Sequence, residues 1–164
     1  MRILLNDRPG HPFEVQLSRQ LAARGHTVQH CYGEFFQSPR GNLQKTSDDP
    51  PNLAIVGIRL NKPFAKYAFF KRIFQEITYS QLLIDQIGSF QPDLVIFANT
   101  PSEAMWLVYW RLRRSRIHFL FWVQDVYGVA INKILRKRLP LLGQFVGKLY
   151  MEMDRYLLRQ SNQI

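Results

Sequence analysis

The stretch Asp93-Leu-Val-Ile-Phe-Ala-Asn-Thr-Pro-Ser-Glu-Ala-Met-Trp-Leu-Val-Tyr-Trp-Arg-Leu-Arg-Arg114 decides the fold class of this chain. Its first part, Asp93–Ala98, is almost entirely apolar and predicts a strand that is buried on both faces. After a short polar segment, Pro101–Arg114 has the pattern of a helix with proline near its start. A buried strand followed by a helix is the repeating unit of a parallel α/β sheet, so we expect that class of fold.

The same alternation of short apolar runs and longer helical stretches continues on both sides of this stretch. Together the runs predict a Rossmann-like parallel sheet of five to six strands flanked by helices. A polar segment over 33–51, which contains three prolines and two glycines, predicts a long loop. The longest expected helix, over 63–90, is either continuous or broken near Gly88. Expected strands cover 3–5, 26–32, 53–60, 93–98 and 117–123, and expected helices cover 12–24, 63–90, 101–114, 129–138 and 142–159.

Length and composition describe one globular domain. The chain has 164 residues, of which 46% are hydrophobic and 21% charged, and this balance excludes a disordered chain. The single cysteine, Cys31, excludes a disulfide framework and a multi-thiol metal site, so we expect a buried thiol in a reducing compartment. No signal peptide or membrane span is recognisable, which predicts a cytoplasmic protein, either free or peripheral on the inner face of the membrane.

Polar segments after three of the expected strands are the candidates for a ligand site, because the crevice of an open α/β sheet lies beyond the carboxyl ends of its strands. Gly10 would let a phosphate approach backbone N–H groups at a helix N-terminus, although Pro9-Gly10 also suits a plain tight turn. Asp125 directly follows a buried strand, either as a catalytic residue or as a cap, and the position of His11 in its loop makes it the second catalytic candidate. The other candidates for ligand contact in these segments are Asn99, Thr100, Gln124, Tyr127 and Gly128.

The formal net charge of +10 favours an anionic partner and is concentrated in two segments. Residues 59–76 contain five basic residues and one acidic residue, and residues 111–138 contain eight and one. Basic residues among aromatic ones suit an anionic membrane surface, with a solvated face over an aromatic core as the alternative. Nucleic acid is not expected, since no binding motif is present. The residues assigned to the anionic surface are Lys62, Lys66, Lys71, Arg72, Arg113, Arg114 and Arg116.

The opening segment resembles the start of family 4 glycosyltransferases of the GT-B type. In that family a strand and a glycine-containing loop lead into a helix that ends in L-x-x-x-G-H-x-V. The pattern is matched here by Leu21, Gly25, His26 and Val28.

Three later segments resemble the same family in the same order. QPDLVIFANTP over 91–101 is similar to the fourth-strand segment, and FWVQDVYGVAI over 121–131 is similar to the fifth-strand segment of colanic-acid and other exopolysaccharide transferases. RQSNQI over 159–164 resembles the segment that leads into a sixth strand, with Asn162 where the family usually has aspartate.

The resemblance implies a retaining transferase that moves a sugar from a nucleotide-sugar to a polysaccharide or lipid-linked acceptor, with no metal required and without another cofactor. It covers only the acceptor-side half of a GT-B fold, so residues 1–164 would form one domain and the nucleotide-sugar domain would be absent. Gly10 would face the donor diphosphate. The usual His-Asp pair after the fifth strand reads Gln124-Asp125 here, and only the role of Asp125 is carried over.

Three interpretations follow from these expectations. The first is an acceptor-side domain that is inactive without its C-terminal donor domain. The second is the separate, membrane-associated half of a split glycosyltransferase, which would recruit a donor half encoded by another gene. The third is a stand-alone flavodoxin-like binding domain, which the parallel sheet alone permits.

Overall fold

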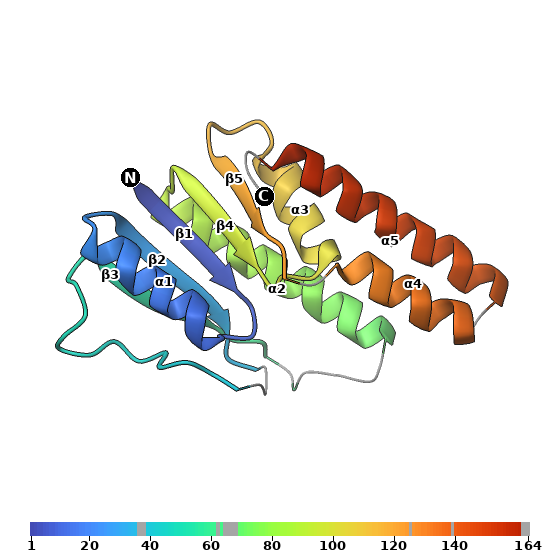
Figure 1. Cartoon of the computed structure of the whole chain (residues 1–164), viewed down its shortest axis with the longest axis horizontal. Coiled ribbons are helices and arrows are strands. Elements are labelled where there is room, and N and C mark those ends of the chain that lie inside the picture. Colours follow the sequence, from blue (N-terminus) through green and yellow to red (C-terminus); the bar gives the residue numbers. More distant parts are fainter. Residues whose placement is uncertain (36–38, 62, 64–68, 125, 139, 162–164) are drawn as a thin grey trace.

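The computed structural model describes residues 1–35, 39–61, 63, 69–124, 126–138 and 140–161 (Figure 1). It contains a five-stranded, all-parallel sheet with five helices and so confirms the Rossmann-like α/β class. The expected sixth strand falls on 162–164, outside the described residues. The strands are β1 (Arg2–Asp7), β2 (Thr27–Gly33), β3 (Leu53–Ile58), β4 (Leu94–Ala98) and β5 (His118–Trp122), and the helices are α1 (Pro12–Ala23), α2 (Phe69–Phe90), α3 (Ser102–Leu112), α4 (Tyr127–Arg138) and α5 (Pro140–Gln160).

The order of the strands in space determines where a ligand crevice can form. The order is β3-β2-β1-β4-β5, so the chain leaves β1 toward one side of the sheet and returns to its other side at β4. The register pairs Asp7 with Ala98 at the carboxyl ends of these two neighbouring strands. The loops that follow β1 and β4 therefore diverge from the point where ligands bind in open α/β sheets.

Each face of the sheet has its own hydrophobic core. On one face, Leu4, Phe97 and Phe119 pack with residues of α2, α3 and α5 such as Leu83 and Leu157. Cys31 belongs to this core and is fully buried, which raises the pKa of its thiol to about 12 and confirms it as a packing residue.

Helices cover only part of the second face of the sheet. Ile3, Leu5 and Val28 pack there against α1, which lies in front of β2 and β3 in Figure 1. Leu120 and Trp122 of β5 belong to the same cluster but remain half-buried. Among the described helices, only α1 contributes buried residues to this face.

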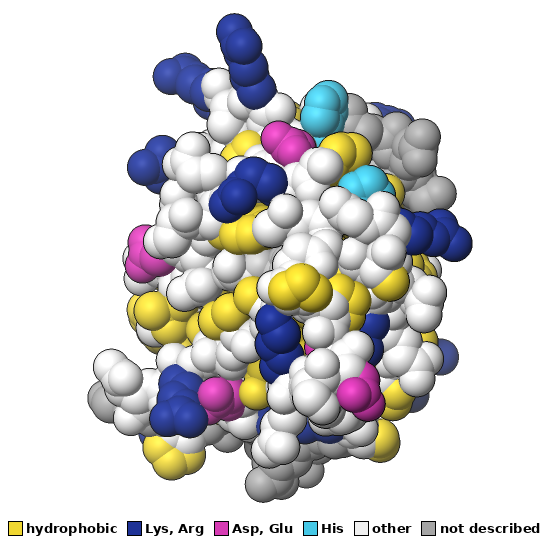
Figure 2. Space-filling model, turned by 90° about the vertical axis from the view of Figure 1, so that its left-hand side faces the viewer, with side chains coloured by type: hydrophobic (Ala, Val, Ile, Leu, Met, Phe, Trp, Pro, Cys, Tyr) yellow, Lys and Arg dark blue, Asp and Glu magenta, His cyan; other side chains and the backbone are white. Residues whose placement is uncertain are grey.

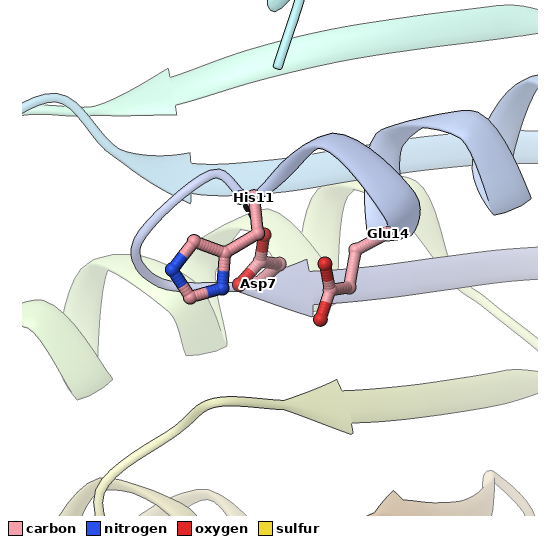
Figure 3. Close-up of side chains that lie close together, drawn as sticks. All are labelled: Asp7, His11 and Glu14. Atoms are coloured by element: carbon pink, nitrogen blue, oxygen red, sulfur yellow. Dashed lines mark hydrogen bonds between the residues drawn. The ribbon is translucent and has the colours of Figure 1, made fainter. Parts of the chain in front are cut away.

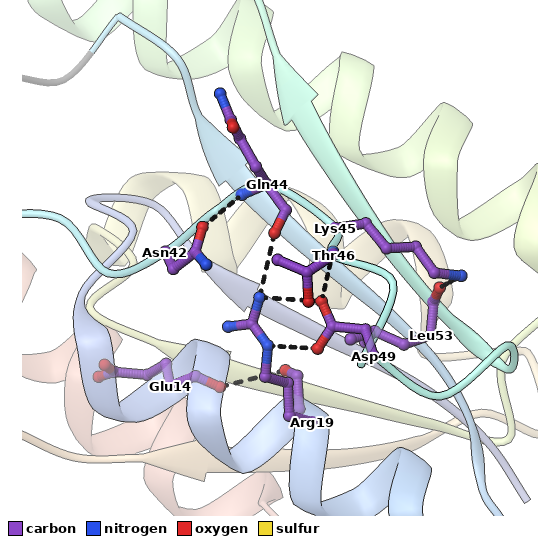
Figure 4. A network of polar contacts seen from close by, with 9 residues as sticks. Glu14, Arg19, Asn42, Gln44, Lys45, Thr46, Asp49 and Leu53 are labelled. Atoms are coloured by element: carbon purple, nitrogen blue, oxygen red, sulfur yellow. Dashed lines mark hydrogen bonds and ion pairs between the residues drawn. The ribbon is translucent and has the colours of Figure 1, made fainter.

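The long loop between β2 and β3 is anchored to α1, and its described residues form neither helix nor strand, as expected. Arg19 of α1 donates from Nε to Asp49 Oδ1 at 2.6 Å and from Nη2 to the Gln44 carbonyl at 3.2 Å (Figure 4). The Arg19 guanidinium lowers the pKa of Asp49 to about 2. The loop also covers Gly10, whose carbonyl accepts from the Gly41 N–H at 2.9 Å.

Helix α2 runs without interruption through Gly88, so the alternative of a break there is wrong. The helix ends at Phe90, and the next residue, Gln91, adopts a positive φ of 52° and donates its N–H to the Ile87 carbonyl at 2.8 Å. A residue with left-handed backbone geometry directly after the last turn is a common way to end a helix. Gly88 is tolerated inside the helix because it is exposed and nothing crowds it.

Helices α4 and α5 form an antiparallel hairpin, which lies beside the carboxyl end of the sheet in Figure 1. Glycines allow the two helices to touch: a Cβ at Gly143 would meet the Leu135 backbone, and one at Gly147 would meet Asn132. The two helices expected over 129–138 and 142–159 are confirmed, but α5 begins two residues earlier than expected, at Pro140, so Gly143 lies in its first turn. None of the described helices is long and apolar enough to cross a membrane.

Candidate functional site

A cluster of polar side chains forms where the loops after β1, β4 and β5 converge. We call it the edge cluster, and it consists of Asp7, His11, Glu14, Asn99 and Gln124. Asp7 is the last residue of β1, His11 and Glu14 come from the start of α1, and Asn99 and Gln124 follow β4 and β5. Figure 3 shows the side chains of Asp7, His11 and Glu14 pointing toward one another.

Asp7 is fully buried at the base of the edge cluster. Burial, and after it the negative charge of Glu14, raises the pKa of Asp7 from 3.8 to about 7. Its carboxylate accepts from the backbone N–H of His11 at the start of α1, and its carbonyl accepts from the Gly10 N–H at 3.1 Å. Asp7 is therefore a carboxyl group that changes its protonation state near neutral pH.

Asn99 connects the members of the edge cluster. Its Nδ2 donates to Glu14 Oε1 at 2.8 Å and lies 3.1 Å from His11 Nδ1 and 3.4 Å from Asp7 Oδ1. An amide nitrogen can only donate, so its contact with His11 is a hydrogen bond in the tautomer whose Nδ1 carries no proton. Asn99 holds this position with a φ of 47°, in the left-handed region that asparagine tolerates better than most residues.

Glu14 carries a negative charge into the interior of the edge cluster. It is fully buried, and its Oε1 accepts from both Asn99 and Gln124. Its second oxygen, Oε2, is buried without a hydrogen-bond partner among the described residues. Glu14 is thus a buried carboxylate with one unsatisfied oxygen, and it lies beside the carboxylate of Asp7. Such a pair indicates a site that lacks a positive charge or hydrogen-bond donors.

A second group of ionisable side chains, of which Arg8 and Glu76 are buried and Glu103 and Tyr127 half-buried, lies on the opposite face of the sheet. We call it the buried cluster, and it consists of Arg8, Glu76, Glu103 and Tyr127. Arg8 and Glu76 form an ion pair whose side chains are 3% and 1% exposed, and burial raises the pKa of Glu76 to about 7 despite the pull of Arg8. Burial also raises the pKa values of Glu103 and Tyr127, and neither carboxylate oxygen of Glu103 has a hydrogen-bond partner among the described residues.

The residues expected to form one site are divided among several places. His11, Asn99 and Gln124 meet in the edge cluster, whereas Tyr127 belongs to the buried cluster. Thr100 is buried and binds Asn6, whose Nδ2 donates to Thr100 Oγ1 at 2.7 Å. Asp125 lies outside the described residues.

Gly10 and Gly128, which the sequence predicts to line the site, instead contact other parts of the chain. Gly10 has a φ of 79° and a Cβ there would meet Leu43, so this position requires glycine. The Gly128 N–H donates to Asp154 Oδ2 at 2.6 Å and faces α5. Neither glycine N–H points freely into the edge cluster, so the proposed phosphate contact of Gly10 remains a prediction from sequence.

The basic residues assigned to an anionic surface do not share one face. Lys71 and Arg72 lie at the start of α2, after the carboxyl end of β3, and Arg72 is half-buried. Exposed residues Arg113, Arg114 and Arg116 precede β5 and lie at the amino edge of the sheet, while Lys62 and Lys66 fall outside the described residues. Basic side chains are scattered among acidic ones on the face drawn in Figure 2.

Sequence reasoning missed the carboxylates that dominate both clusters, namely Asp7, Glu14, Glu76 and Glu103. One signal was present, because Asp7 ends an apolar strand just as Asp125 does. Glu14 follows His11 by three positions, the spacing that brings side chains together on one side of a helix. Comparison with protein-family models and with curated proteins found no match for this chain.

Proposed function

We propose that this chain is the acceptor-side domain of a retaining glycosyltransferase, which moves a sugar from a nucleotide-sugar to a polysaccharide or lipid-linked acceptor. The observation that carries the proposal is the edge cluster, five polar side chains gathered at the switch point of a parallel sheet. The resemblance of the sequence to family 4 transferases supplies the reaction class.

The chemistry of the edge cluster suits an acceptor hydroxyl. Carboxylate, imidazole and amide groups provide both donors and acceptors for sugar hydroxyls. Asp7, with a pKa of about 7, would take up a proton from the attacking hydroxyl at neutral pH, and half-exposed His11 would orient that hydroxyl. Asp125, as the sequence predicts, would contribute beside Gln124.

The same cluster is poorly suited to a donor diphosphate. Asp7 and Glu14 are acidic, and the departing diphosphate of a nucleotide-sugar requires groups that stabilise negative charge. We therefore assign donor binding to a separate domain, in cis or as another chain, and expect the 164-residue chain to be inactive alone.

Binding of a water-soluble, short-chain prenyl-diphosphate sugar, followed by NMR of backbone amides, tests the proposal. We expect shifts at residues 7–14 and at Asn99. His11→Ala should weaken binding by about tenfold, the loss expected for a hydrogen bond to a polar ligand. His118→Ala is the matched control, because His118 is exposed at the amino edge of the sheet. Equal weakening by both variants, or turnover of nucleotide-sugar by the chain alone, contradicts the proposal.

A second candidate, the membrane-associated half of a split transferase, is favoured by the surface of the α4–α5 hairpin. Leu142, Phe145 and Leu149 recur on one face of α5 and are 63%, 70% and 52% exposed. Exposed Lys133, Lys137 and Lys148 lie on the same two helices. Apolar side chains among lysines are the pattern of a surface that binds anionic lipid.

Flotation with phosphatidylglycerol vesicles at low salt tests this candidate. We expect the wild-type chain to bind, and Leu142→Ser with Phe145→Ser to abolish binding. Lys71→Ala with Phe74→Ser, and Arg113→Ala with Arg114→Ala, test the two surfaces expected from sequence. Loss of binding in either of those variants but not in the hairpin variant, or no binding by the wild type, contradicts the hairpin as the membrane surface.

A further inference from the structure

We propose that Asp7, His11 and Glu14 bind one divalent cation of the first transition row. Each of the three residues offers a ligand atom, and these atoms all lie within 4.8 Å of one another. Bonds of about 2.0–2.2 Å to nitrogen and oxygen allow two ligands on one cation to be about 4.4 Å apart at most. Small side-chain movements therefore suffice for all three to reach the same ion.

The burial of the two carboxylates calls for a compensating positive charge. Asp7 and Glu14 are both 0% exposed, and none of the ion pairs among the described residues includes either of them. Glu14 Oε2 is buried without a hydrogen-bond partner in the described part of the chain. Because isolated buried carboxylates are costly, a cation between them would satisfy both the charge and the free oxygen.

Asn99 offers a fourth ligand. Its Nδ2 lies 2.8, 3.1 and 3.4 Å from atoms of Glu14, His11 and Asp7, which is close to the spacing of about 3 Å between neighbouring ligands on one cation. Half a turn of the amide exchanges Nδ2 for Oδ1, which is an acceptor and a metal ligand. The left-handed backbone of Asn99 holds the amide in this place.

The donor set indicates which ion fits. One imidazole nitrogen with carboxylate and amide oxygens suits Mn²⁺ or Zn²⁺, whereas Ca²⁺ and Mg²⁺ prefer oxygen ligands throughout. No metal was expected from the sequence, because the single cysteine excludes a multi-thiol site and the family that the sequence resembles requires no metal. Residues 7, 11 and 14 combine a strand end with a helix start, and only the tertiary structure shows how close they lie. The inference goes beyond the proposed function and stands without it, since every ligand belongs to this chain.

Titration of the tag-free chain with Mn²⁺, followed by the electron paramagnetic resonance signal of the free ion, tests the proposal. We expect one bound Mn²⁺ per chain, displaced by Zn²⁺, which binds such sites more tightly. Bound Mn²⁺ should also broaden the NMR amide signals of residues 7–14 and Asn99 more than those of α2.

Variants separate this site from adventitious surface binding. His11→Ala and Glu14→Gln should each weaken Mn²⁺ binding by about tenfold or more. His118→Ala and Asp85→Asn, which change exposed residues elsewhere, should leave it unchanged. Circular dichroism identifies any variant that fails to fold, and His11→Ala, at a half-buried position, keeps the test independent of the buried Glu14. Absence of binding at millimolar Mn²⁺ and Zn²⁺, or equal affinity in His11→Ala and His118→Ala, overturns the proposal.

Discussion

Asn99 Nδ2 donates to Glu14 Oε1 at 2.8 Å and so joins the loop after β4 to the first turn of α1 across 85 positions of sequence. The bond crosses the switch point between β1 and β4, and Asn99 reaches it with a φ of 47°. The residue thus has two roles, since its side chain ties the edge cluster together and its backbone occupies a region that few residues adopt.

These two roles predict different effects of two substitutions. Asn99→Ala removes the side-chain hydrogen bonds and puts alanine, which tolerates positive φ less well than asparagine, at this position, and it should lower the free energy of unfolding by about 1–3 kcal/mol. Asn99→Gly removes the same bonds without backbone strain and should be about 1 kcal/mol more stable than Asn99→Ala. Urea unfolding measures both. Equal stability of the two variants would show that the backbone at Asn99 is not strained.

His30 predicts a loss of stability in mild acid. The imidazole is 0% exposed, and burial, aided by the charge of Arg19, lowers its pKa from 6.5 to about 3. Between these two values the unfolded chain binds a proton that the folded chain does not, so stability is lost as pH falls below 6.5. His30 alone should reduce the free energy of unfolding by about 2 kcal/mol between pH 7 and pH 5.

The His30→Gln variant isolates this effect, because every other titrating group is shared with the wild type. Urea unfolding at several pH values should show a shallower decline for the variant across this range. Parallel declines in the two proteins would mean that His30 does not carry the acid sensitivity.

Loss of one partner of the buried Arg8–Glu76 pair should lower the stability of the folded chain far more than loss of one partner of a surface pair. Arg8→Met or Glu76→Gln leaves a buried charge or an unmatched polar group and should cost about 3–5 kcal/mol of stability. Replacing both, as Arg8→Met with Glu76→Leu, should cost less than the two single changes combined.

Arg155 and Glu152 form the control pair, with side chains 58% and 64% exposed. Arg155→Ala should leave the thermal midpoint nearly unchanged, because exposed pairs contribute little. A similar loss of stability at both pairs would contradict the importance assigned to burial.

Two glycine-to-alanine substitutions should change the stability of the folded chain in opposite directions. At Gly143 a Cβ would meet the backbone of Leu135 in α4, so Gly143→Ala should destabilise by about 1–3 kcal/mol through overpacking. At Gly88 a Cβ meets nothing within 4 Å, so Gly88→Ala should stabilise α2 by about 0.5–1 kcal/mol. Thermal unfolding measures both, and stabilisation by Gly143→Ala would mean that α4 and α5 pack more loosely than described.

Much of the fold was predictable because its signals are local. Apolar runs such as Asp93–Ala98 specify strands, and the stretches between them specify helices, so all five described strands lie where the sequence predicts them, to within a few residues. The end of α2 at Phe90 also lies where the sequence predicts it, whereas the alternative of a break near Gly88 is wrong, because an exposed glycine disfavours a helix by only about 0.5–1 kcal/mol.

The candidate site could be predicted only in part. The rule that ligands bind beyond the carboxyl ends of parallel strands identified His11, Asn99 and Gln124, which meet in the edge cluster. The same rule also selected Thr100 and Gly128, which bind Asn6 and Asp154 instead, since neighbouring residues in a loop point in different directions.

The sequence by itself determined the class of the fold, the buried thiol at Cys31 and the edge of the sheet where polar residues gather, because periodicity and strand polarity are properties of short segments. Only the tertiary structure decided which charges share that edge. The strand order β3-β2-β1-β4-β5 places β1 beside β4, and this pairing brings Asn99 to Asp7, His11 and Glu14. Their burial then raises the pKa of Asp7 and leaves Glu14 in need of a partner, effects that depend on neighbours distant in sequence.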